Sequence, residues 1–126
     1  MSRYKSQGFN NTFKNARKGF NLALRSEINI RVHVVVATLV LLAAFYLKFS
    51  VVEICIVLFA IALVICCEML NTAIEFTLDS IYHNRYSRMV GMAKDISAGA
   101  VMFATVISVC IGLILYGSKI LPLILS

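Results

Sequence analysis

Charged residues are scarce in this sequence. They make up 14% of its 126 positions, and only six of them are acidic, whereas 60% of the residues are hydrophobic. A chain this apolar is not an ordinary soluble domain of its length, so we expect one small domain over 1–126 that resides in a membrane. The single proline, Pro122, lies near the carboxyl end, where it leaves the long apolar runs uninterrupted.

Several other common signals are also missing. The four cysteines lie in apolar runs and form no C-x-x-C pair, so the sequence indicates neither a disulfide framework nor a zinc site. The first residues are polar and basic, unlike a cleavable signal peptide. Walker A and glycine-rich kinase motifs are absent, so a bound nucleotide would depend on side chains and metal alone.

Three largely uncharged runs are long enough to cross a bilayer as helices, and we expect spans at about 32–48, 53–79 and 95–118. Ahead of them, apolar residues recur at helical spacing from Phe9 through Phe13 to Phe20, and the other face is basic. This pattern predicts an amphipathic surface helix over about 9–30, although a helix packed on the rest of the domain fits it too. The basic face is short and continuous with a membrane protein, so we expect no nucleic-acid partner.

The placement of lysine and arginine predicts the orientation. Seven precede the first span and three lie in the polar connection expected over 80–95, against one in the first turn and one near the end. By the positive-inside rule the N-terminus and that connection are cytoplasmic and the C-terminus is outside. Because three helices make a thin bundle, we expect a homo-oligomer whose helices meet at small residues, namely Ala100, Ala104, Ser108 and Gly112.

The most informative stretch is an acidic stripe at the end of the second span. At 100° per residue one helix face carries Glu68, Asn71, Thr72, Glu75 and Asp79. An ionised side chain at the bilayer centre costs on the order of 2.5–3.5 kcal/mol, so these acids need a cation, a positive side chain or another helix. The stripe fits a divalent-metal site with a spare carboxylate, and it also fits a solvated last turn with helix-packing groups.

Carboxylates and a lysine at one membrane face suit the handling of a magnesium-bound polyphosphate. In phosphoryl transfer Glu75 and Glu27 would hold the metal and Lys94 would neutralise phosphate. Glu68 lies two turns deeper, where it would act as a general base toward a lipid hydroxyl. For Glu27 a local salt bridge with Arg31 at i+4 is an equally good interpretation. His33, taken alone, is typical of a membrane-interface residue rather than a ligand.

Four stretches resemble the prokaryotic diacylglycerol kinase family, in the style of its undecaprenol kinase branch. They are Glu68-x-Leu70-Asn71-Thr72-Ala73-Ile74-Glu75-x-x-Leu78-Asp79, Ala93-Lys94-Asp95-x-x-Ala98-Gly99-Ala100-Val101, Phe13-Lys14-Asn15-Ala16-x-Lys18-Gly19 and Glu27-x-Asn29-x-Arg31-x-His33. The resemblance implies an all-α integral membrane homotrimer in a bacterial plasma (inner) membrane. It would transfer the γ-phosphate of Mg-ATP to a lipid alcohol, with undecaprenol favoured over diacylglycerol.

The resemblance also assigns residues to roles by matching position. Glu68 takes the role of catalytic base, and Glu27 and Glu75 those of Mg²⁺ ligands. The ATP-binding residues would be Lys94, Asp95, Arg85, Tyr86 and Ser87. The transfer site and lipid headgroup would be contacted by Asn71, Arg31, Asn29, Lys18 and Ala98. In the family the site is shared between neighbouring protomers.

Two other functions fit parts of the pattern. A small cation transporter would also place acids in a membrane helix, but it would want them near the midplane, whereas Glu75 and Asp79 approach the cytoplasmic end. A non-catalytic assembly factor would use the small residues, but it gives Glu27, Glu68 and Glu75 no reason to be acidic.

Overall fold

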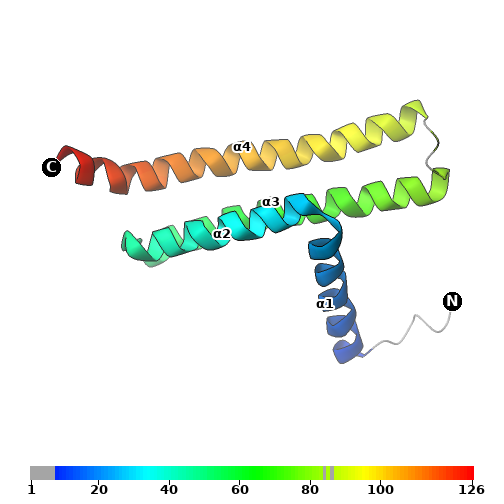
Figure 1. Cartoon of the computed structure of the whole chain (residues 1–126), viewed down its shortest axis with the longest axis horizontal. Helices are drawn as coiled ribbons and strands as arrows, with labels where there is room; N and C mark the ends of the chain where they lie inside the picture. The colour runs from blue at the N-terminus through cyan, green and yellow to red at the C-terminus, as the bar shows by residue number, and fades with distance from the viewer. Residues whose placement is uncertain (1–7, 84, 86) are drawn as a thin grey trace.

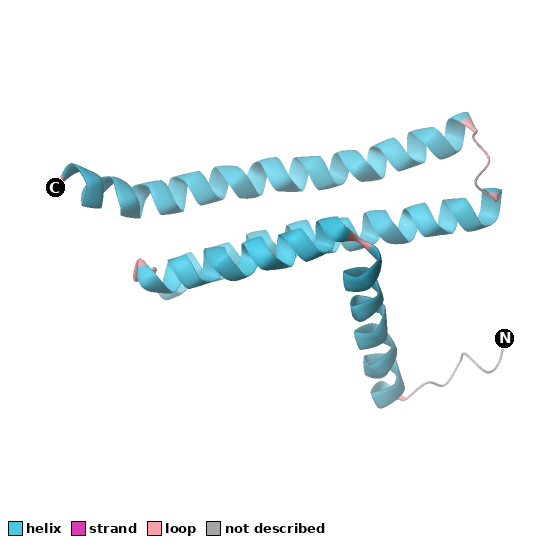
Figure 2. Ribbon diagram, in the orientation of Figure 1, coloured by secondary structure: helices cyan, strands magenta, loops and turns pink. Residues whose placement is uncertain are grey.

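The computed structural model describes residues 8–83, 85 and 87–126. Within this part of the chain all regular structure is helical and no strand occurs (Figure 2). The helices are α1 (Phe9–Ser26), α2 (Ile28–Tyr46), α3 (Val51–Tyr82) and α4 (Arg88–Leu125). Figure 1 shows α2, α3 and α4 running along one long axis, while α1 turns away from them. The helix α3 packs against both α2 and α4.

Three of the helices, α2, α3 and α4, are long and apolar enough to cross a membrane. The prediction of an all-α chain with three membrane-length helices is therefore confirmed. At about 1.5 Å per residue, α3 is about 48 Å long and α4 about 57 Å, against a hydrocarbon core of about 30 Å. Both helices must therefore project beyond a bilayer by several turns.

The polar connection expected over 80–95 is mostly helical instead. The helix α3 continues to Tyr82, and α4 already begins at Arg88. Ser87 caps α4, because its side-chain oxygen accepts a hydrogen bond from the Val90 backbone N–H at 3.1 Å. After α3, His83 adopts a left-handed conformation with φ 51°. The expected limits marked where the polar connection begins, but a helix that has left the bilayer tolerates polar residues and continues.

A break separates α1 from α2 at Glu27, whose extended backbone (φ −123°, ψ 118°) ends one helix and precedes the next. The surface helix expected to reach about residue 30 therefore ends at Ser26. The Arg31 guanidinium donates to the carbonyls of Leu24 and Arg25, at 2.9 Å each. These bonds satisfy carbonyls in the last turn of α1. Arg31 makes no ion pair with Glu27 in the described part of the chain, so that alternative is wrong here.

The opposite end of the bundle is closed by contacts among all three long helices. Ser50 and Glu53 form a reciprocal capping box at the start of α3, and Lys119 of α4 lies 3.3 Å from the Glu53 carboxylate. The Tyr116 hydroxyl donates to the Val40 carbonyl at 2.6 Å. These contacts fix α4 against the turn that joins α2 to α3.

Small residues bring α4 close to α3. Ala104 is only 2% exposed, and the Ser108 hydroxyl donates to the Ala60 carbonyl at 3.3 Å. Ala100 is exposed in the single chain, so the contact between copies that was expected of it stays a prediction. A four-residue repeat drifts about 40° per step around a helix, so it leaves the contact face, which instead passes through Ser97 and Ala104.

Candidate active site

The acidic stripe of α3 faces the interior of the bundle. Glu68 and Thr72 are buried, at 7% and 5% exposure, although both are polar. Asn71, Glu75 and Asp79 are partly buried on the same face. Burial of a carboxylate on a membrane-length helix carries a large free-energy cost unless a partner compensates it. The contacts of these side chains therefore define the candidate site.

The depth of the stripe follows from helix geometry. Seventeen residues separate Val51, at the start of α3, from Glu68, which corresponds to about 26 Å along the axis. That length approaches the hydrocarbon thickness of about 30 Å. Glu68 therefore lies near one boundary of the apolar layer, and Glu75 and Asp79 lie further out, toward water.

Glu68 is paired with a histidine from α2. The His33 Nε2 atom lies 3.3 Å from Glu68 Oε1, and the exposed fractions of the two side chains are 27% and 9%. No local sequence pattern indicates this contact, because 35 positions separate the two residues. Only the packing of α2 against α3 brings them together.

A polar network continues outward from Glu68. The Asn71 side-chain amide donates to Glu75 Oε1 at 3.3 Å. From α4, the Ser97 hydroxyl faces Asn71 Oδ1 in a short hydrogen bond. Ser97 is only 8% exposed, and sequence reasoning missed it. The signal that was available is its position in the second motif, between Asp95 and Ala98.

The first turns of α4 contact the last turns of α3 through an ion pair. Lys94 Nζ lies 2.7 Å from Asp79 Oδ1, and both side chains are more than a third exposed (36% and 39%). The lysine expected at the phosphate therefore already has a carboxylate partner in this chain. Its exposure leaves it accessible to an anionic ligand that approaches from the water.

Other predicted site residues are not gathered around Glu68. Glu27 is partly buried at the break between α1 and α2, and Ser87 caps α4. The exposed residues of the predicted set are Lys18, Asn29, Arg31, Arg85, Asp95 and Ala98. Tyr86 lies outside the described residues. Among the described residues no group of three or more His, Cys, Asp or Glu side chains is placed to hold a metal ion.

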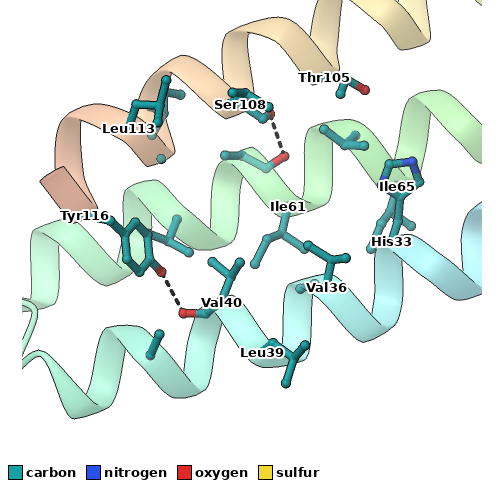
Figure 3. Close-up of a pocket in the computed structure, with 18 of the residues that line it drawn as sticks. His33, Val36, Leu39, Val40, Ile61, Ile65, Thr105, Ser108, Leu113 and Tyr116 are labelled. Carbon is teal, nitrogen blue, oxygen red and sulfur yellow. Dashed lines mark hydrogen bonds between the residues drawn. The ribbon is translucent and has the colours of Figure 1, made fainter.

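A groove of about 630 Å³ extends from this site between α2, α3 and α4. Figure 3 shows His33 at one end and Tyr116 at the other, with Val36, Val40 and Ile61 between them. The wall is almost wholly apolar, and its polar residues are His33, Thr105, Ser108 and Tyr116. The polar site thus opens onto a surface that suits hydrocarbon.

Three membrane-length helices with a buried carboxylate near the lipid boundary define an integral membrane protein with a polar site at that boundary. The model of the family described as prokaryotic diacylglycerol kinase matches residues 14–116. The chain belongs to this family, and it is a membrane lipid kinase.

Two relatives support this membership. The chain is 36% identical over 112 residues to the undecaprenol kinase of Bacillus subtilis, and this alignment covers 89% of this chain and 90% of that protein. It is 31% identical over 115 residues to the diacylglycerol kinase of Synechocystis sp., and this alignment covers 91% of this chain. The chain spans 63% of the length of the Synechocystis protein.

Proposed function

We propose that this protein transfers the γ-phosphate of Mg-ATP to the hydroxyl of undecaprenol. The observation that carries the proposal is the buried Glu68 carboxylate near the lipid boundary, beside a groove that suits a hydrocarbon chain. Undecaprenol is favoured because the Bacillus relative is more similar and is matched over 90% of its length. Diacylglycerol is the second candidate acceptor, favoured by the Synechocystis relative.

In this mechanism Glu68 accepts the proton of the lipid hydroxyl. The hydroxyl oxygen then forms a bond to the γ-phosphorus, the bond from that phosphorus to the β–γ bridging oxygen breaks, and ADP leaves. Asn71 donates to Glu75 and is held in turn by Ser97, so the network orients the Glu75 carboxylate. Lys94, exposed at the membrane surface, offers positive charge to the nucleotide phosphates.

The carboxylate oxygens of Glu75 and Glu27 are the kind of donor that magnesium prefers. Glu75 is partly buried, and its Oε1 accepts a hydrogen bond from Asn71, which leaves its second oxygen outside that contact. Glu27 is also partly buried. Mg²⁺ prefers oxygen ligands and is often bound by one or two carboxylates together with substrate phosphates, so two carboxylates are enough protein ligands for it. Bound there, the ion would neutralise charge on the phosphates.

The rest of the proposal concerns assembly and orientation. Large apolar side chains remain exposed on the long helices, for example Phe45 at 63%, Phe59 at 76% and Phe103 at 69%. We assign part of this surface to lipid and part to two further copies in a homotrimer. The exposed aromatic residues of α1, Phe9 (83%) and Phe13 (61%), lie in the bilayer interface. The N-terminus and site face the cytoplasm, and the C-terminus faces out.

The test is a direct assay of the purified protein in detergent. Radiolabelled ATP is supplied with undecaprenol or with diacylglycerol, and labelled lipid is quantified for the wild type and for Glu68→Ala. We expect labelled undecaprenol phosphate from the wild type and a loss of label in the variant. Faster labelling of diacylglycerol would select the second acceptor. If neither lipid is labelled, the proposed function is wrong.

A further inference from the structure

We propose that His33 is a positioning residue for the Glu68 carboxylate, an assignment that rests on the proposed lipid kinase function. It holds one carboxylate oxygen so that the other faces the lipid hydroxyl. The contact joins α2 to α3 at the polar end of the apolar groove.

The Glu68 side chain is 9% exposed, and a carboxylate buried to this degree needs a charged or hydrogen-bonding partner. Three ion pairs occur among the described residues, and His33 is the partner that Glu68 has in this set. Lys94, a cation near the stripe, is paired with Asp79 further out. Within one chain, Glu68 therefore depends on the imidazole of His33.

A carboxylate free to rotate offers either oxygen to an incoming hydroxyl, in many orientations. His33 Nε2 lies against Oε1, which leaves Oε2 to accept the hydroxyl proton. When Oε2 has taken that proton, Oε1 is the carbonyl oxygen of a carboxylic acid, which is able to accept a hydrogen bond from an imidazole N–H group. The contact therefore persists through the step, so the geometry of the base does not have to be rebuilt in each cycle.

His33 belongs both to the pair with Glu68 and to the wall of the groove, where Figure 3 shows it at the end away from Tyr116. The groove wall between His33 and Tyr116 is mainly aliphatic. The imidazole thus orients the carboxylate at the point where an apolar surface meets the polar site.

The test compares two variants of the full-length protein in the labelling assay. His33→Leu removes the N–H group and retains a side chain of moderate size. His33→Gln retains an N–H donor at a similar distance from the backbone. We expect kcat to fall at least about tenfold in His33→Leu. A loss of about this size is typical when a group that orients a metal-ligating side chain is removed. The KM for Mg-ATP should change less than about twofold, and His33→Gln should recover kcat to within about threefold of wild type.

The control is His83→Asn, which removes the other of the two histidines from an exposed position and keeps a residue that tolerates positive φ. It should retain the wild-type kcat. Circular dichroism and size-exclusion chromatography show whether each variant is folded. If His33→Leu does not fold, His33→Gln decides, because a kcat within about threefold supports the assignment and a fall of about tenfold overturns it.

Two further outcomes separate this assignment from the proposed function. If the wild type is active, the positioning role alone is overturned by either of two results. One is an unchanged kcat in His33→Leu, and the other is a kcat of His33→Gln no higher than that of His33→Leu. A wild-type protein that labels neither lipid overturns the proposed function and this role with it.

Discussion

Glu68 and Glu75 lie seven residues apart on one face of α3, yet their surroundings differ. Glu68 is buried against His33, whereas Glu75 is partly exposed and contacts an amide. We predict that Glu68→Gln lowers kcat by about 10²- to 10⁴-fold, the usual contribution of a general base, because the amide cannot accept the proton. The KM for Mg-ATP should stay within about twofold, as steady-state labelling at varied ATP would reveal.

The substitution Glu75→Gln should act on the metal instead. The amide retains an oxygen but loses the negative charge that favours a hard cation. We predict that the Mg²⁺ concentration needed for half-maximal activity rises about tenfold, while the KM for lipid is unchanged. A magnesium titration at saturating lipid measures this. Identical kinetic effects of Glu68→Gln and Glu75→Gln would contradict the division of roles between the two acids.

The ion pair between Lys94 and Asp79 leads to a paired prediction. Lys94→Ala should raise the KM for ATP about tenfold or more, because a charge-assisted contact to phosphate is lost. Asp79→Asn should leave this KM equal or lower, since the lysine is then released from its carboxylate partner. Measuring the KM of both variants separates a phosphate contact from a purely structural salt bridge, for which both variants would be equally impaired.

How far single residues were predictable depends on whether their partners are local. Glu68, Asn71 and Glu75 were found from sequence, because residues at helical spacing share a face whatever packs against it. His33 and Ser97 were missed, because each matters through a contact with a different helix. No periodicity in α2 or α4 indicates which position will face α3.

At the scale of the helices, the close approach of α4 to α3 holds the network in place. Ala104 is 2% exposed at this contact, so Ala104→Leu should push the helices apart and destabilise the protein by about 1–3 kcal/mol. The matched control is Ala100→Leu, one turn away on the exposed side of α4. Thermal unfolding in detergent measures both variants. Equal losses of stability would mean that Ala104 is not the point of closest packing.

The existence of the three long helices was predictable, but their ends were not. Hydropathy detects the apolar part of a helix, so it placed limits near 79 and 95, whereas α3 continues to Tyr82 and α4 begins at Arg88. The actual ends depend on caps such as Ser87 and on the left-handed His83. The break at Glu27 has no proline or glycine to mark it, and Arg31 stabilises it by bonds to the end of α1.

At the scale of the whole molecule, one chain holds only part of the predicted site. Ser97 faces α3, whereas Asp95, two positions earlier and about 200° around the same helix, is exposed. The carboxylate of Asp95 therefore lies on the side of α4 away from the network around Asn71. If Asp95 contacts nucleotide, as its motif indicates, that nucleotide belongs to the site of a neighbouring copy.

A subunit-mixing experiment tests this sharing. Asp95→Asn and Glu68→Gln, each nearly inactive alone, are co-expressed in equal amounts. In a ring where each site takes Glu68 from one chain and Asp95 from the next, random mixing restores an intact pair in about one quarter of the sites. We therefore predict labelling at about a quarter of the wild-type rate. As a control, Glu68→Gln mixed with Glu75→Gln should be no more active than the average of the two variants assayed alone, because both acids lie on the same α3 and serve the same site. Recovery in neither mixture would place the whole site within one protomer.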